Sequence, residues 1–159
     1  MTKQKKKDDE SINIVARNRK ASFEYELLET LECGMVLKGT EVKSLRDRHC
    51  QLDQAYVSRE DGELWLINCE IAEYSKGNLM NHAPKRKRKL LVHRREIEKF
   101  AGKAEQRGFT MVPTKVYFRN SRAKVEIAVA RGKQTVDKRQ SIKERDVKKE
   151  ISRAARSHS

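Results

Sequence analysis

One stretch of the chain, residues 32–46, joins a strand pattern to a helix pattern at a single glycine. Residues 35–37 are three apolar residues in a row, as in a strand that is covered on both faces. Gly39 ends this pattern. Thr40 can then cap a helix N-terminus, and Glu41 suits the positive end of the helix dipole. The stretch therefore predicts a strand that turns directly into a short helix over residues 40–48, packed against the sheet.

The hydrophobic pattern elsewhere in the first 132 residues indicates mainly strands. Residues 12–15 begin the ordered part of the chain. Residues 23–31 fit a strand or a helical turn, and we favour a long strand that continues to residue 37. Asp61-Gly62, between two apolar runs, is a strong hairpin signal. Val125, Ile127 and Val129 alternate with Lys124, Glu126 and Ala128, as in a strand with one buried face.

One longer helix is expected among these strands. Residues 90–107 carry apolar side chains at helical spacing, and Gly108 suits the position just after a helix end. Strands and helices do not alternate in the order that a parallel sheet requires. The sequence thus predicts a mainly β fold: an oligonucleotide-binding (OB)-type antiparallel barrel over residues 12–132, with two or three helices.

The charge balance points to a polyanionic partner. The chain has 159 residues, with 37 Lys and Arg against 23 Asp and Glu, a net charge of +14 and a pI near 9.9. Such an excess favours phosphate contacts with release of counterions. No long apolar run, signal peptide or lipidation motif is visible, so we expect a cytoplasmic protein with no membrane partner. The three cysteines lack metal-ligand spacing, and we expect them to be reduced thiols.

Residues 75–89 form a polar stretch that is expected to be a functional or disordered loop. It ends in five consecutive cations, residues 85–89. A solvated charge run or a nuclear-import signal are alternatives, but contact with a nucleic-acid backbone is the favoured interpretation, with Asn81 and His82 nearby to bond or stack on bases. Composition alone does not separate RNA from DNA here.

The two ends of the chain differ from the middle. Residues 1–11 are polar and basic, and we expect them to be disordered. Residues 133–159 carry nine basic and four acidic residues, with a narrow apolar stripe at helical spacing. Because isolated helices of this kind are marginal in water, the tail is expected to be unfolded alone and to become helical on a partner.

No set of residues suggests catalysis, a metal site or a cofactor. Nucleophile–base pairs, glycine-rich phosphate loops and paired catalytic carboxylates are not apparent. Trp65, Tyr56, Tyr74 and Tyr117 are candidates for stacking on nucleotides, although most are expected to pack in the core or at the barrel rim. The rival classes are a ribosomal protein with a basic extension, a DNA-binding barrel and a small enzyme that acts on RNA.

Several separated blocks resemble the small protein B (SmpB) family, the bacterial partner of transfer-messenger RNA. These blocks are Asn18-Arg19-Lys20-Ala21, Glu32-Cys33-Gly34-Met35-Val36-Leu37, Gly39-Thr40-Glu41-Val42-Lys43-Ser44-Leu45-Arg46, Asn81-His82-Ala83-Pro84, Arg88-Lys89-Leu90-Leu91, Lys124-Val125-Glu126-Ile127, and Gly132-Lys133 with Asp137-Lys138-Arg139 and Lys143-Glu144-Arg145-Asp146. Two positions depart from the family pattern: Cys33 replaces a usual Ala, and Ala83 replaces a common acid.

The resemblance implies a barrel that grips the tRNA-like domain of transfer-messenger RNA near its D-loop and elbow. It also implies that the RNA is delivered, with elongation factor Tu, to ribosomes stalled on broken messages in trans-translation. The basic tail is then expected to become helical in the empty mRNA channel, beside the decoding centre of the small subunit, and to sense that no message is present.

The expected site residues fall into two groups. The RNA-binding group comprises Asn18, Arg19, Lys20, Glu32, Lys43, Arg46, His82, Lys85, Arg86, Arg88, Lys89, Leu91 and His93. The group tied to ribosome function comprises Gly132, Asp137, Lys138, Arg139, Lys143 and Arg145. A carboxylate on an RNA-facing surface is unusual, so we hypothesise that Glu32 accepts a hydrogen bond from a base amino group or a 2′-hydroxyl, or that it orients a neighbouring arginine.

Overall fold

The computed structural model describes residues 12–77, 81–106, 108–132 and 135–157, with the backbone alone for residues 135–141 and 155–157. The expected disorder of residues 1–11 falls outside this part. The elements are β1 (Ile12–Arg17), α2 (Arg19–Glu24), β2 (Tyr25–Met35), α3 (Gly39–Arg46), β3 (Cys50–Gln51), β4 (Tyr56–Glu60), β5 (Glu63–Ile67), β6 (Glu70–Ile71), β7 (Arg88–Leu91), α4 (Arg94–Ala104), β8 (Phe109–Arg119), β9 (Arg122–Gly132) and α5 (Thr135–Ser157).

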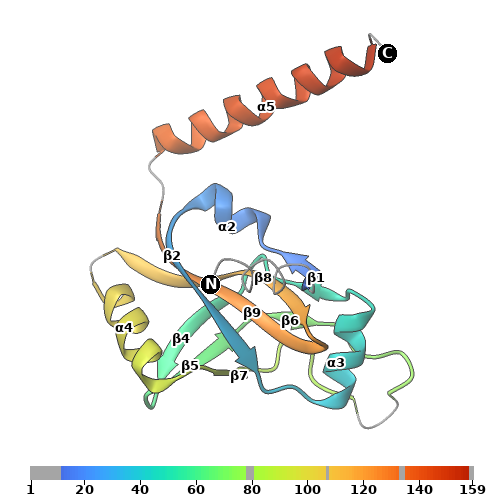
Figure 1. The fold of residues 1–159 in the computed structure, drawn as a ribbon, viewed down its shortest axis with the longest axis vertical. Helices are drawn as coiled ribbons and strands as arrows, with labels where there is room; N and C mark the ends of the chain where they lie inside the picture. The colour runs from blue at the N-terminus through green and yellow to red at the C-terminus, as the bar shows by residue number, and fades with distance from the viewer. Residues whose placement is uncertain (1–11, 78–80, 107, 133–134, 158–159) are drawn as a thin grey trace, which may run out of the picture.

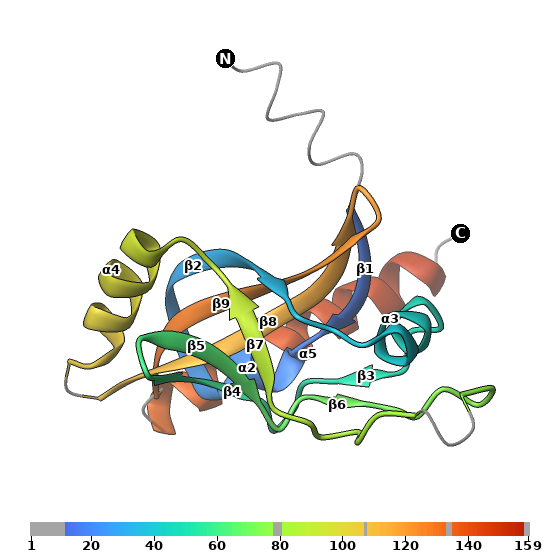
Figure 2. The same cartoon turned by 90° about the horizontal axis from the view of Figure 1, so that it is seen from below.

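The strands form a closed antiparallel barrel, as the sequence predicted (Figures 1 and 2). The order is β1-β8-β4-β5-β7-β2-β9, and a further pairing of β8 with β9 closes the ring, with β1 attached at the side of β8. The short strands β3 and β6 pair as a separate ribbon. Helices α3 and α4 lie at opposite ends of the barrel, so each end is covered differently.

The barrel interior is filled by the alternating strand residues. Val125, Ile127 and Val129 on β9 all belong to the main core cluster, and Leu64 and Leu66 on β5 join them. The hairpin between β4 and β5 is confirmed, because Asp61 and Gly62 both have positive φ, as a tight two-residue turn of this kind requires. Strand alternation in the sequence therefore identified the interior correctly on these strands.

The N-terminal boundary of β2 differs from the expectation. Residues 19–24 form the helix α2, whereas the sequence pattern favoured a strand from residue 23. The side chain of Asn18 decides this, since its Oδ1 accepts a hydrogen bond from the Ala21 N–H at 3.0 Å and its Nδ2 donates to the Pro113 carbonyl at 2.8 Å. The second contact comes from 95 residues away, which local patterns do not reveal.

Three further boundaries also differ. Strand β2 ends at Met35 and not at residue 37. Residues 88 and 89 belong to strand β7 and not to a loop. The helix expected over residues 90–107 is shorter, since α4 begins at Arg94 with His93 as its N-cap. Pairing of β7 with β5 and β2 holds residues 88–91 extended, which outweighs their helical spacing.

Helix α5 projects from the barrel beyond α2 (Figure 1). One of its contacts with the body is the Arg145 guanidinium over the Phe23 ring of α2, at 5.5 Å from the centroid. Ile142, Val147 and Ile151 on α5 are exposed. This is the helical conformation expected for the bound tail, and the absence of helix in the free tail stays a prediction. Among the described residues, no helix is both long and apolar enough to cross a bilayer.

Candidate nucleic-acid interface

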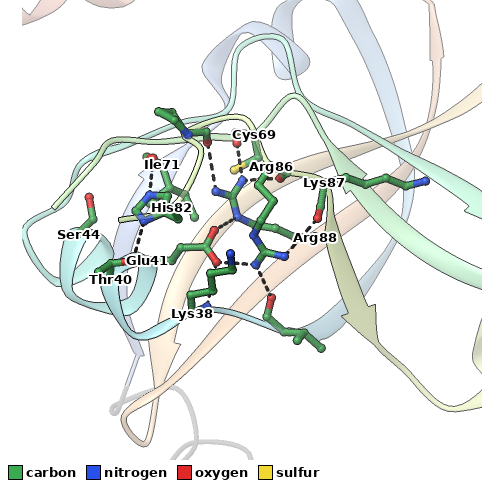
Figure 3. A network of polar contacts seen from close by, with 12 residues as sticks. Lys38, Thr40, Glu41, Ser44, Cys69, Ile71, His82, Arg86, Lys87 and Arg88 are labelled. Carbon is green, nitrogen blue, oxygen red and sulfur yellow. Dashed lines mark hydrogen bonds and ion pairs between the residues drawn. The ribbon is translucent and has the colours of Figure 1, made fainter. Parts of the chain in front are cut away.

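The carboxylate of Glu41, at the start of α3, is fully buried and receives three donors (Figure 3). The backbone N–H of Lys38 donates to its Oε1 at 2.8 Å, the Nη2 of Arg86 donates to the same oxygen, and the Nε of Arg88 donates to Oε2. Burial by itself would raise the pKa of Glu41, but these hydrogen bonds and the arginine charges hold it below its ordinary value. Glu41 is therefore ionised and joins α3 to the basic segment.

Arg88 is fully buried, which corrects its expected place on the RNA-facing surface. Besides the ion pair with Glu41, its guanidinium donates to the carbonyl oxygens of Cys69 at 2.6 Å, Arg86 at 2.9 Å and Pro84 at 3.1 Å. A guanidinium satisfied in this way has no face left for a nucleic acid. Arg86 is also engaged, with Glu41 and with the Val36 carbonyl at 3.2 Å.

His82 is likewise an internal residue, which corrects its expected contact with bases. Its Nε2 lies 2.8 Å from the carbonyl oxygen of Ile71, and its Nδ1 lies 2.9 Å from the Thr40 hydroxyl. A carbonyl only accepts, so Nε2 carries a proton and donates to Ile71, and the Thr40 hydroxyl is the hydrogen-bond partner of Nδ1. His82 thus fastens the polar segment to α3, while Asn81 exchanges two hydrogen bonds with the Tyr74 backbone.

The remaining lysines of the basic run stay on the surface, because alternate residues of an extended segment face opposite sides. Lys85 is exposed. Lys87 pairs with Glu60 and lies 4.8 Å from the ring centroid of Trp65. Lys89 pairs with Glu63 at 2.6 Å. The run of five cations is therefore divided into two inward arginines and three outward lysines.

A surface groove of about 480 Å³ gathers four of the predicted RNA-binding residues, Glu32, Lys89, Leu91 and His93. They come from β2, β7 and the start of α4, up to 61 positions apart in the chain. Gly34 permits this arrangement, because a Cβ there would lie 3.2 Å from the Cβ of Leu91 on the neighbouring strand. The groove offers apolar side chains, the carboxylates of Glu32, Glu63 and Glu96, and the ammonium groups of Lys89 and Lys124 on one surface.

Two residues in contact with Glu32 were absent from the predicted RNA-binding group, although Tyr117 was named as a candidate for stacking. The hydroxyl of Tyr117 donates to Oε2 of Glu32, and Nη2 of Arg119 pairs with the same oxygen at 3.2 Å. Burial raises the pKa of Tyr117 above its ordinary value, and the nearby Glu32 carboxylate raises it further. Lys124 of β9 also lines the groove, opposite Gly34 on β2 and Tyr117 on β8. Strand alternation places Tyr117 and Arg119 on the same face of β8. Only the pairing register of β2, β9 and β8 brings that face to Glu32.

The other predicted residues lie elsewhere. Asn18 is the buried cap of α2, whereas Arg19 and Lys20 are exposed on that helix. Lys43 and Arg46 are exposed on α3, and Arg46 lines a second cavity of about 450 Å³ together with Arg48. The sequence-derived set is thus distributed over the groove, α2, α3 and the segment of residues 82–88 beside Glu41.

The structure describes the side chains of only some of the predicted tail residues. Gly132 ends β9 and is exposed, and Lys143 and Arg145 are exposed on α5. The side chains of Asp137, Lys138 and Arg139 lie outside the described residues, although their backbone belongs to α5. Within the described part of the chain, no cluster of His, Cys, Asp and Glu side chains is arranged to hold a metal ion.

Comparison with known proteins identifies the family. The model of the SmpB protein family matches residues 15–157. This chain belongs to the SmpB family. Two SmpB relatives, named SsrA-binding protein, come from Frankia casuarinae, 50% identical over 141 residues and 89% of each chain, and from Brucella canis, 50% identical over 153 residues, 96% of this chain and 97% of the relative.

A solved structure supports the same assignment. It is described as "tmRNA-SmpB: a journey to the center of the bacterial ribosome" and is 50% identical to this chain. The superposition has a TM-score of 0.65 and covers 76% of this chain and 85% of the other. The structural comparison and the sequence comparisons thus both support the family that the residue blocks suggested.

Proposed function

We propose that this protein binds transfer-messenger RNA and brings it to stalled ribosomes in trans-translation. The observation that carries the proposal is the groove that gathers Glu32, Lys89, Leu91 and His93 in a chain of the SmpB family. Relatives named SsrA-binding protein, at about half identity over most of their length, support the same role. Exposed cations on α2 and α3 add sequence-independent phosphate contacts.

In this proposal the barrel recognises the tRNA-like domain, and elongation factor Tu is engaged indirectly through the RNA. The protein itself is a non-catalytic RNA-binding protein of the cytoplasm, where ribosomes translate. Helix α5 extends from the barrel with exposed Lys143 and Arg145, and its geometry suits a basic rod that enters the empty mRNA channel near the decoding centre. The barrel and the tail therefore have separate tasks.

A binding titration tests the proposal. Purified protein is titrated with transfer-messenger RNA, an elongator tRNA and duplex DNA of equal charge over a range of salt concentrations. The salt slope counts phosphate contacts, and the affinity ratios measure what lies beyond them. We expect a strong preference for transfer-messenger RNA at similar salt slopes. Equal affinity for all three would overturn the proposal, because net charge alone would then explain binding.

A further inference from the structure

The two oxygens of the Glu32 carboxylate have different environments. Both described donors, the Tyr117 hydroxyl and Nη2 of Arg119, contact Oε2. In the described part of the chain, no hydrogen bond or ion pair to Oε1 is seen. Glu32 lines the groove, and its side chain is about one third exposed. The protein thus fixes one oxygen and leaves the other as an acceptor at the groove surface.

Tyr117 is held more firmly than an ordinary surface tyrosine. The residue is only 3% exposed, and Lys115 and Arg119 lie against its ring, with the Lys115 Nζ and the Arg119 Cζ at 5.5 and 5.9 Å from the centroid. Both cations favour the electron-rich ring face. The strand backbone on either side is paired with β1 and β9. The hydroxyl therefore has a fixed position, from which it orients Glu32.

Arg119 balances the negative charge of Glu32. Its guanidinium pairs with Glu32 on the same oxygen that Tyr117 contacts, while its buried Nε has no hydrogen-bond partner in the structure. An isolated carboxylate would repel an RNA backbone, and the arginine offsets that repulsion. The arrangement allows a negatively charged acceptor to operate beside a polyanion.

We propose that Tyr117 and Arg119 are positioning residues for RNA recognition, which direct Oε1 of Glu32 at a hydrogen-bond donor of the bound RNA. The donor is a 2′-hydroxyl or a base N–H group, since phosphate and base carbonyl oxygens do not donate. This inference rests on the proposed function. It adds two residues from β8 to the groove and assigns a separate role to each carboxylate oxygen of Glu32.

A double-mutant cycle on RNA affinity tests the inference. Tyr117→Phe keeps the ring and removes the hydroxyl, and we expect it to weaken binding of the tRNA-like domain by about three- to tenfold, since one hydrogen bond to a charged group is lost. In a Glu32→Ala background the same change is expected to have no effect, because Tyr117 acts through Glu32. Arg119→Gln, which reaches Glu32 from another side, is expected to behave in the same way.

Controls separate this role from a structural one. Tyr56→Phe on β4 keeps the exposed ring that is a stacking candidate and removes only its hydroxyl, so it is expected to leave affinity unchanged. Thermal melting of each variant reports loss of folding. If Tyr117→Phe or Arg119→Gln weakens binding equally with and without Glu32, the positioning role is refuted. A wild-type chain without preference for transfer-messenger RNA would instead refute the proposed function.

Two forms of the RNA ligand show which chemical group donates the hydrogen bond to Glu32. The tRNA-like domain is prepared as RNA and as a copy with 2′-deoxyribose throughout, and the loss caused by Glu32→Ala is measured on both. A loss confined to the RNA identifies a 2′-hydroxyl, and an equal loss on both copies identifies a base N–H group; either result supports an acceptor role. No loss on either copy overturns the inference.

Discussion

At the scale of single residues, burial divides side chains that look equivalent in the sequence. Arg86 and Arg88 turn inward to Glu41, whereas Lys85, Lys87 and Lys89 turn outward. Arginine suits the inward positions because its planar group donates in several directions at once, while lysine is a strongly hydrated point charge. The basic run is therefore partly a structural element and partly a binding surface.

Replacing Glu41 by Gln is predicted to reduce the free energy of unfolding by about 3 kcal/mol, because the fully buried Arg88 loses its counter-charge. Urea unfolding at pH 7 measures the loss. Glu63→Gln is the matched control, since Glu63 pairs with Lys89 on the surface and should contribute less than about 1 kcal/mol. Equal effects of the two substitutions would contradict the central role of the Glu41 network.

The same residue predicts a pH dependence. The pKa of Glu41 is lower in the folded chain than its ordinary value of 4.5, so the folded state is stabilised by this group above pH 4.5. That stabilisation is lost as the pH falls through the folded pKa. The difference in unfolding free energy between wild type and Glu41→Gln should therefore shrink below pH 4.5. A difference that stays constant down to pH 3 would speak against an ionised Glu41.

Cys33 is predicted to be an unreactive thiol in the folded protein. It is buried in the core, and burial, with the charges of Glu96 and Glu32, raises its pKa to about 12. Since the thiolate is the reactive form, iodoacetamide at pH 8 should label Cys33 roughly a thousandfold more slowly than in the unfolded chain. Peptide mass mapping measures the rates, and similar rates in both states would disprove the prediction.

At the scale of elements, the position of α2 depends on hydrogen bonds from its N-cap residue to strand β8. Asn18 caps the helix and also bonds to the carbonyl of Pro113 on β8, while its N–H donates to the Thr114 carbonyl at 2.7 Å. Two hydrogen bonds thus join the cap of this six-residue helix to the barrel wall, and the third caps the helix itself. The position of the exposed Arg19 and Lys20 follows from this junction.

Asn18→Ala is predicted to cost about 2 kcal/mol of unfolding free energy, because the helix loses its cap and the Pro113 carbonyl loses a buried donor. Asn18→Ser should cost less, since a serine hydroxyl can still cap the helix. Asn13→Ala, an exposed change on β1, is the control and should stay within about 0.5 kcal/mol. If serine and alanine had the same effect, capping would not be the reason.

At the scale of the whole molecule, the barrel and the tail are predicted to be separable. No described residue of α5 belongs to either core cluster, and Arg145 of α5 contacts Phe23 of α2. Deletion of residues 133–159 removes nine basic and four acidic residues, or five of the fourteen net charges. RNA binding should remain within a few-fold of wild type, while rescue of stalled ribosomes should be lost.

Filter binding and a rescue assay on a message without a stop codon measure these two activities. A matched control replaces residues 133–159 with a neutral linker of equal length, which separates the loss of charge from the loss of chain. A loss of RNA affinity beyond tenfold on truncation would show that the tail is part of the RNA grip and not a separate sensor.

The sequence by itself determined the antiparallel barrel, the hairpin at Asp61-Gly62 and the basic tail. These depend on local alternation, on residues that tolerate positive φ and on composition, which are all properties of neighbouring positions. The resemblance to the SmpB family also named Glu32 and Leu91, which the structure places in one groove.

Only the tertiary structure decided which polar residues face inward. Arg88 is buried because Glu41, 47 positions earlier, supplies its counter-charge, and His82 is buried because Thr40 and Ile71 satisfy its ring. Tyr117 reaches Glu32 across 85 positions. A buried polar side chain needs partners that the fold brings together, so its direction is set by contacts distant in sequence and not by its own neighbours.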